Sequence, residues 1–272
     1  MNVAYQGEPG AYSEEAALAL FPDGCPTGYR TFGQAFDALG SALAAVAVLP
    51  VENSLGGVVQ EVNDLLWERP GLRVRGEHVH PIRHCLLGFR GSPVTRAFSH
   101  PQALAQCRKW LEARDIEAVP VHDTAGAARQ VAEERESGVA AVASAAAARR
   151  YGLEVLAEAI QDDDSNRTRF LVIDRGEPDR PGAAGRLGYK VSLAFVTAHQ
   201  PGSLVRSLYS FSSRNVNLTR LDSRPVPQRP FEYRFYLDLE VSDPEAAEWA
   251  LRDLEAHASE VRLFGTYPAF TA

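Results

Sequence analysis

Lysine is almost absent from this sequence of 272 residues. Lys109 and Lys190 are the only two, so arginine supplies 26 of the 28 basic residues. Lys109 stands beside Trp110 within a helical pattern, which argues against Schiff-base chemistry at a lysine. A protein of this composition has to bind anions through arginine side chains or through the N–H groups at helix N-termini.

The usual marks of a bound metal or cofactor are also missing. The cysteines are three in number, widely spaced and without a Cys-x-x-Cys pair, and we predict reduced thiols at Cys25, Cys85 and Cys107. His78 and His80 alternate along a predicted strand, and neither they nor His84 forms part of a His-Glu-x-x-His motif. There is no Gly-x-Gly-x-x-Gly, P-loop or Gly-x-Ser-x-Gly motif. We therefore predict that the protein uses no metal and no cofactor.

Basic surface charge and long apolar runs are lacking as well. A net charge of −7 argues against a nucleic-acid partner, which normally requires a basic face. No apolar run reaches the length of a membrane span, and Met1–Tyr5 has neither the basic nor the long apolar region of a signal peptide. The sequence thus predicts a cytoplasmic protein with no membrane partner.

Short apolar runs alternate with helical patterns through the first two-thirds of the chain, as in a parallel α/β sheet. We predict two α/β lobes with a cleft between them. The expected strands are Asn2–Tyr5, Ala45–Leu49, Ala97–Phe98, Glu117–Val121, Val139–Ala143 and Phe170–Ile173, with strand-like alternation from Leu72 to Phe89. The expected helices start at about Ser13 and span Phe32–Leu43, Val59–Trp67, Pro101–Ala113, Thr124–Arg135 and Ala145–Tyr151.

A segment rich in glycine, proline and charge, Asp174–Leu187, is the best candidate for a linker. The pattern beyond it is β-α-β-β-α-β, which is typical of a ferredoxin-like α+β domain. Its predicted elements are, in order, strand Lys190–Val196, helix Ser203–Ser213, strands Val216–Leu221 and Tyr233–Leu239, helix Pro244–Ala258 and strand Val261–Tyr267.

Polar residues gather where predicted strands end, which is where an open α/β sheet binds its ligands. The candidates are Glu52-Asn53-Ser54 before Gly56-Gly57, Ser99-His100-Pro101-Gln102, Asp123-Thr124, Ser144, and Asn166-Arg167-Thr168-Arg169 ahead of Phe170. Helix capping alone would explain Thr124 and Ser144. Three polar residues before a Gly-Gly pair exceed what one cap needs, and glycines let backbone N–H groups approach a ligand closely.

In this order and spacing the segments resemble the bacterial prephenate dehydratases over nearly the whole chain. The matching pieces are Tyr5–Ser13, Val51–Ser54 with Gly56-Gly57, Ser99–Leu104, and Asn166 with the Thr168-Arg169-Phe170 signature. The resemblance implies a two-lobed catalytic domain of the periplasmic-binding-protein type at 1–176, a linker at 177–187 and an ACT regulatory domain at 188–272. Lobe 1 would comprise about 1–78 and 157–176, and lobe 2 about 79–156. No chorismate mutase segment precedes these motifs, so a monofunctional enzyme is expected.

The resemblance also implies the reaction and its residues. Prephenate would be converted to phenylpyruvate, carbon dioxide and water, with Thr168 assisting the leaving hydroxyl. The residues expected to orient the substrate are Glu52, Asn53, Ser54, Ser99, Gln102, Thr124, Ser144 and Arg169. In a regular strand Thr168 and Arg169 face opposite sides, so either the strand begins after them or Arg169 serves the structure.

Phenylalanine is the effector that the resemblance implies, bound at a subunit interface of a homodimer or homotetramer. The expected binding residues are Gly202, Ser203, Leu204 and Val205, where the family has Gly-Ala-Leu-Val, and Asp222, Ser223, Arg224 and Pro225, where it has Glu-Ser-Arg-Pro. Two other functions stay open: an arogenate dehydratase, which performs the same elimination on the amino analogue, and a non-catalytic sensor of amino acids.

Overall fold

The computed structural model describes residues 1–183 and 188–270. Its contacts divide the chain into two units. The first comprises Met1–Gln60 with His78–Phe170, and the second comprises Glu61–Glu77 with the chain from Leu171 onward. Two of the boundaries between the units, at 77/78 and 170/171, fall within strands, which span Leu72–Pro81 and Arg167–Arg175.

The first sheet of the α/β region has the strand order β2-β1-β3-β11-β5, with β4 paired to β3. Its strands are β1 (Asn2–Gln6), β2 (Cys25–Tyr29), β3 (Val46–Asn53), β4 (Gly57–Val58), β5 (Leu72–Pro81) and β11 (Arg167–Arg175). Strand β1 is parallel to both β2 and β3, and the helices α1 (Tyr12–Leu20) and α2 (Phe32–Gly40) make the crossovers between them. Helix α3 (Gln60–Glu68) follows β4.

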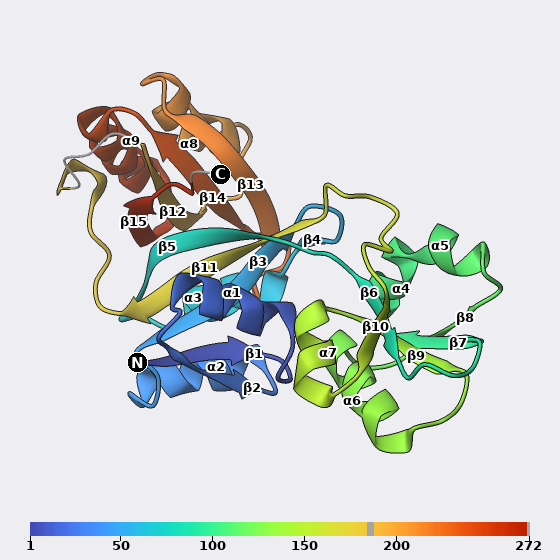
Figure 1. The fold of residues 1–272 in the computed structure, drawn as a ribbon. Coiled ribbons are helices and arrows are strands. Elements are labelled where there is room, and N and C mark those ends of the chain that lie inside the picture. The colour runs from blue at the N-terminus through green and yellow to red at the C-terminus, as the bar shows by residue number, and fades with distance from the viewer. Residues whose placement is uncertain (184–187, 271–272) are drawn as a thin grey trace. The chain divides into compact units, whose positions relative to one another are not determined.

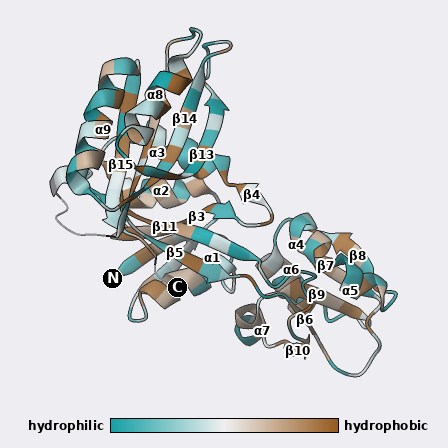
Figure 2. Cartoon of the chain, turned by 90° about the horizontal axis from the view of Figure 1, so that it is seen from above, coloured by the Kyte–Doolittle hydropathy of each residue, from teal (hydrophilic) through white to brown (hydrophobic). Residues whose placement is uncertain are grey.

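The second sheet, shown mainly in green in Figure 1, has the order β10-β6-β9-β7-β8. The elements of this lobe are β6 (Cys85–Gly88), β7 (Arg96–Ser99), α4 (Pro101–Gln106), α5 (Arg108–Glu112), β8 (Glu117–Pro120), α6 (Thr124–Glu134), β9 (Val139–Ala143), α7 (Ala145–Tyr151) and β10 (Glu154–Ala157). Every residue of the central strand β9 is buried, and Figure 2 shows it as hydrophobic. The expected two α/β lobes are therefore present.

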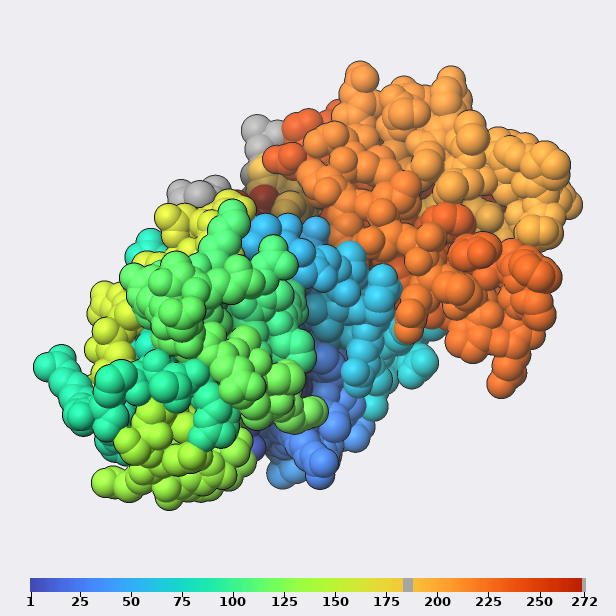
Figure 3. Space-filling model, turned by 90° about the vertical axis from the view of Figure 1, so that its right-hand side faces the viewer, coloured from blue at the N-terminus to red at the C-terminus, as the bar shows by residue number. Residues whose placement is uncertain are grey.

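The C-terminal elements form the β-α-β-β-α-β domain that the sequence predicts. They are β12 (Tyr189–Val196), α8 (Ser203–Ser212), β13 (Asn217–Pro225), β14 (Tyr233–Val241), α9 (Pro244–His257) and β15 (Glu260–Pro268). The sheet is antiparallel with the order β13-β14-β12-β15, and one apolar core joins it to α8 and α9. These are the connections and strand order of a ferredoxin-like fold. Figure 3 shows the surface of this domain in orange.

Several predicted boundaries are wrong, each for a local reason. Helix α2 ends at Gly40 because the chain turns at Ala42, which has a φ of +62°, and Leu43 is left 64% exposed. The strand-like alternation expected from Leu72 to Phe89 is confirmed, and it comprises the two strands β5 and β6. The single helix expected over Pro101–Ala113 breaks at Cys107, whose φ of −114° is not helical.

Two strands are longer at the site than the sequence indicates. Strand β3 continues through Glu52 and Asn53 instead of ending at Leu49, and β11 begins at Arg167, so Thr168 and Arg169 both lie within it. The strands β2 and β10 have no counterpart among the predicted elements. Strand β11 also extends to Arg175 at the start of the expected linker, of which residues 184–187 lie outside the described chain. Within the described ranges, no helix is long and apolar enough to cross a membrane.

Candidate active site

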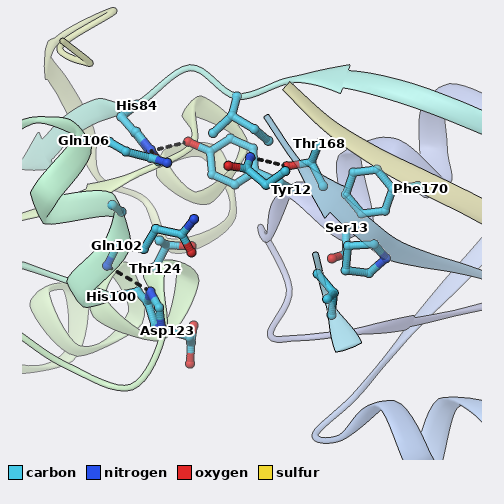
Figure 4. A pocket seen from close by; sticks show the side chains of 15 residues that line it. Tyr12, Ser13, His84, His100, Gln102, Gln106, Asp123, Thr124, Thr168 and Phe170 are labelled. Carbon is cyan, nitrogen blue, oxygen red and sulfur yellow. Dashed lines mark hydrogen bonds between the residues drawn. The ribbon is translucent and has the colours of Figure 1, made fainter. Parts of the chain in front are cut away.

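A cavity of about 260 Å³ opens in the first unit and is lined by side chains from both lobes. Four of the predicted residues line it: Asn53, Gln102, Thr124 and Thr168. In Figure 4, Thr168, Phe170 and Ser13 lie on one side of the cavity, and Gln102, His100, Thr124 and Asp123 lie on the other. A small substrate can therefore be held between groups that come from different lobes.

Thr168 is held by Asn53. The Asn53 Nδ2 atom donates to Thr168 Oγ1 over 2.9 Å and also lies 2.9 Å from Asn166 Oδ1 and 3.0 Å from the Arg167 carbonyl oxygen. The Thr168 oxygen is thus occupied as an acceptor, and no acceptor among the described residues takes its hydroxyl hydrogen. Since Thr168 lines the cavity, that hydrogen is available to a bound molecule.

The direction of these hydrogen bonds is fixed by the backbone. Asn53 Oδ1 accepts from the N–H groups of Leu55 (3.1 Å) and Gly56 (2.7 Å), which can only donate, so the Nδ2 atom of Asn53 must face Asn166 and Thr168. Asn166, fully buried, in turn donates from Nδ2 to Gln106 Oε1 over 3.0 Å. The amide orientation of each side chain therefore follows from the one before it.

The same chain of hydrogen bonds continues to His84 and Tyr12. Gln106 Oε1 lies 2.9 Å from His84 Nε2, which must carry the hydrogen because Gln106 Oε1 is an acceptor. His84 Nδ1 lies 2.8 Å from the Tyr12 hydroxyl, as Figure 4 shows. Burial lowers the pKa of His84 and raises that of Tyr12 well above its usual range, so both are neutral near pH 7. A neutral His84 that carries its hydrogen on Nε2 donates to Gln106 and offers Nδ1 to Tyr12 as an acceptor. The Tyr12 hydroxyl also lies 2.9 Å from the Arg83 carbonyl oxygen, so its single hydrogen is shared between these two acceptors.

This arrangement predicts how stability depends on pH. The folded-state pKa of His84 lies below the unfolded value of about 6.5, so the unfolded chain binds the extra proton more readily in acid. We expect the free energy of unfolding to fall as the pH drops below about 6.5, because protonation of His84 favours the unfolded chain. His78, whose pKa burial also lowers, adds to it in the same direction.

Urea unfolding at pH 7.5 and pH 5.5 checks this expectation. The His84→Gln variant should lose less stability between the two pH values than the wild type. The matched control is His199→Gln, at an exposed position with no ion pair among the described residues, which should keep the wild-type dependence. An unchanged pH dependence in His84→Gln would contradict the assignment of a neutral, buried imidazole.

No arginine or lysine is found among the described residues that line the cavity. Helix N-termini are the remaining source of positive potential, and two helices of sufficient length start there. Tyr12 and Ser13 open α1, whose cap residue Ala11 supplies no side-chain hydrogen bond, and Thr124 opens α6. The first N–H groups of a helix have no partner within it and attract anions. The cavity thus receives positive potential from two helix N-termini, which is partly offset by the Asp123 carboxylate at the cap of α6 and by Glu14 and Glu15 in the first turn of α1.

The other predicted site residues lie outside this lining. Arg169, on the opposite face of β11 from Thr168, is 3.3 Å from Glu52 in an ion pair. Ser54 accepts from the Arg167 N–H over 3.0 Å and donates to the Ser165 carbonyl oxygen. These three residues hold β3 and β11 together at the edge of the site.

Two predicted serines are buried in the lobes. Ser99 donates to the Val142 carbonyl oxygen over 2.6 Å. Ser144 caps α7 and donates to the Gly10 carbonyl oxygen over 2.9 Å, which joins lobe 2 to the loop before α1. Both serines therefore stabilise the backbone around the cavity, each by donating to a carbonyl oxygen.

Several lining residues are not among the predicted site residues, among them Tyr12, Ser13, His84, Gln106 and Phe170. Tyr12, Ser13 and Phe170 belong to segments that carry the family resemblance, so a signal was present for these three. Asp123, a candidate beside Thr124, also lines the cavity. Gln106 and His84 carry no local signal, because their role depends on contacts with Asn166 and Tyr12 that are distant in sequence.

A second cavity, of about 220 Å³, lies in the C-terminal domain. It is lined by the predicted residues Gly202, Ser203, Leu204 and Val205. The other predicted group, Asp222 to Pro225, lies on β13 and does not line it: Asp222 pairs with Arg220, and Arg224 lies 2.8 Å from Asp64. Across residues 1–183 and 188–270, no cluster of three or more His, Cys, Asp or Glu side chains is placed to hold a metal ion.

Comparison with known proteins identifies the family. The family model described as prephenate dehydratase matches residues 3–178. The chain is 44% identical over 284 residues to an Arabidopsis thaliana protein called arogenate dehydratase/prephenate dehydratase 2, chloroplastic, with 100% of this chain and 74% of the relative covered.

Two solved structures share the whole fold. One, described as GqqA, a novel type of quorum quenching acylase, has a TM-score of 0.91 and 36% identity, with coverage of 99% of this chain and 98% of the other. The second is a prephenate dehydratase from Arthrobacter aurescens in complex with L-Phe, with a TM-score of 0.88, 28% identity, and coverage of 98% and 90%.

Fold and site together define a two-lobed α/β enzyme with a helix-polarised cavity and a ferredoxin-like domain after it. The chain belongs to the prephenate dehydratase family and is a lyase.

Proposed function

We propose that this protein catalyses the decarboxylating dehydration of prephenate to phenylpyruvate, or of arogenate, the amino analogue of prephenate, to phenylalanine. The observation that carries the proposal is the Thr168 hydroxyl, whose oxygen accepts from Asn53 while its hydrogen remains available to the cavity. The relatives with names that combine both dehydratase activities support the choice of these two substrates.

The reaction needs little from the protein beyond orientation and one hydrogen bond. The bond between the ring and its carboxylate breaks, its electrons move through the diene, and the bond to the ring hydroxyl breaks as the ring becomes aromatic. The departing hydroxide requires a hydrogen-bond donor, which Thr168 supplies, and then a proton, which comes from solvent water. The N-termini of α1 and α6 are placed to receive the carboxylate that stays with the product.

The test is to supply the purified protein with each substrate and to follow release of carbon dioxide together with phenylpyruvate or phenylalanine. Turnover of either substrate supports the proposal and excludes a non-catalytic sensor. If neither is turned over, the proposed function is wrong.

The acylase described among the structural neighbours gives a rival activity to test in the same preparation. A hydroxyl that attacks an acyl group needs a general base within hydrogen-bond reach. The hydrogen-bond partner of Thr168 is instead the amide donor of Asn53. We therefore expect no hydrolysis of an N-acyl amide under conditions that give dehydratase turnover.

For the C-terminal domain we propose an ACT-type regulatory role with phenylalanine as the effector, in a homodimer or homotetramer. The L-Phe complex of the Arthrobacter aurescens neighbour supports the choice of ligand. In this chain the cavity at Gly202–Val205 starts at the N-terminus of α8, whose N–H groups suit a carboxylate. The cytoplasmic location stays a prediction from the sequence.

If the C-terminal domain is regulatory, the dehydratase rate should respond to free phenylalanine. We expect millimolar phenylalanine to change the rate at fixed, subsaturating substrate, because an effector that binds one of two states more tightly shifts the equilibrium between them. Alanine at the same concentration is the control and should have no effect, since it lacks the aromatic ring. A rate that stays constant across this range of phenylalanine concentration would contradict the regulatory role.

A further inference from the structure

One carboxylate faces the cavity that is proposed to bind a substrate with two carboxylates. Asp123 lines it, and among the described lining residues no other aspartate or glutamate is found. The groups that could offset its charge are few: the N-terminus of α6, which Asp123 caps, and His100 on the same side of the cavity. His84 and Tyr12 are neutral. No described basic side chain forms an ion pair with Asp123.

Only one oxygen of the Asp123 carboxylate takes part in a hydrogen bond within the described structure. Asp123 caps α6, with its Oδ1 atom accepting from the Gly126 N–H over 2.5 Å. The side chain packs directly over Gly126, where an added Cβ would lie 2.7 Å from Oδ2. No described donor reaches Oδ2, so one oxygen of a partly exposed carboxylate remains open at the cavity.

The two candidate substrates differ at one group, and that group decides how each interacts with Asp123. Arogenate carries an ammonium beside its side-chain carboxylate, and an ammonium donates charge-assisted hydrogen bonds to a carboxylate. Prephenate has a ketone there, which has no hydrogen to donate and whose oxygen is repelled by a carboxylate. The adjacent N-terminus of α6 is suited to the neighbouring carboxylate of either substrate.

We propose that Asp123 is the specificity-determining residue of the site, that its open oxygen binds the ammonium of arogenate, and that the protein prefers arogenate to prephenate. This inference rests on the proposed dehydratase function. The side-chain end of the substrate then lies at Asp123 and Thr124, and the leaving hydroxyl lies across the cavity at Thr168, as the two sides in Figure 4 allow.

The test compares kcat/KM for arogenate and prephenate in the wild type and in Asp123→Asn. Asparagine caps a helix about as well as aspartate, so the substitution removes the charge and preserves the fold. We expect kcat/KM for arogenate to fall about 10- to 100-fold, the range for a hydrogen bond between charged groups. The value for prephenate should hold or rise, because a repulsive charge is removed. Asp243→Asn, the same change at the cap of α9, is the matched control and should leave both values unchanged.

The ratio of the two values, measured on one preparation, does not depend on the fraction of protein that is folded. A variant in which both values fall by the same factor, or in which neither changes, would overturn the proposal while the dehydratase function stands. A wild type that turns over prephenate but not arogenate would overturn it as well. A wild type inactive on both substrates would instead show that the proposed function is wrong.

Discussion

Replacement of Thr168 by valine is expected to lower kcat by about two to four powers of ten for whichever substrate the protein uses. Valine keeps the branched shape of threonine and removes the hydroxyl, so the fold and the cavity should be preserved. The variant loses the hydrogen bond to the leaving hydroxyl, which forms most strongly in the transition state. The effect should therefore appear in kcat more than in KM.

Two further variants show whether loss of the Thr168 hydroxyl is the cause of the lower kcat. Thr168→Ser retains it and should keep turnover within about tenfold of the wild type. Thr95→Val makes the same change at a threonine that donates to the Gly138 carbonyl oxygen and does not line the cavity, and should leave kcat unchanged. Turnover near the wild-type level in Thr168→Val would show that another group assists the leaving hydroxyl.

The fold was predictable from sequence where a single local pattern settles each element. Strand β9 and helix α7 were predicted to the residue, because five apolar residues are followed by a serine cap and then by a helical run. Strand β2 was missed because its sequence, Cys-Pro-Thr-Gly-Tyr, contains a proline and a glycine, which strands disfavour. Its pairing with β1 over five residues stabilises the strand where its own sequence does not.

In the site, too, features that depend on one sequence segment were predictable, and features that depend on contacts between distant residues were not. That Asn53 and Thr168 line one cavity could be predicted, because each lies in a segment that carries the family resemblance. The way they act together could not, because the polarity of their hydrogen bond is fixed by the N–H groups of Leu55 and Gly56 and extends to residues such as Gln106. Arg169 illustrates the reverse: it is adjacent to Thr168 in sequence, yet alternation along β11 directs it to Glu52.

Replacement of Asn53 by aspartate is expected to lower kcat/KM by about 10²- to 10³-fold, although only one atom type changes. The retained oxygen can still accept from Leu55 and Gly56. The second oxygen faces Asn166 Oδ1, the Arg167 carbonyl oxygen and Thr168 Oγ1, three acceptors where asparagine had a donor. Thr168 then has to donate its hydrogen to the new carboxylate, and the leaving hydroxyl of the substrate loses its partner. The buried acceptors left without a donor should also lower stability by about 1–3 kcal/mol.

The effects of Asn53→Asp and Thr168→Val should therefore depend on one another, and a double-mutant cycle measures that dependence. If Asn53 acts by directing the Thr168 hydrogen into the cavity, the aspartate substitution should cost much less activity in a Thr168→Val background than in the wild type. Asn2→Asp, the same change at an exposed residue that donates to the Leu43 carbonyl oxygen, is the control and should leave kcat/KM unchanged. Fully additive losses would mean that Asn53 contacts the substrate independently, and that the hydroxyl of Thr168 is oriented by something other than its amide.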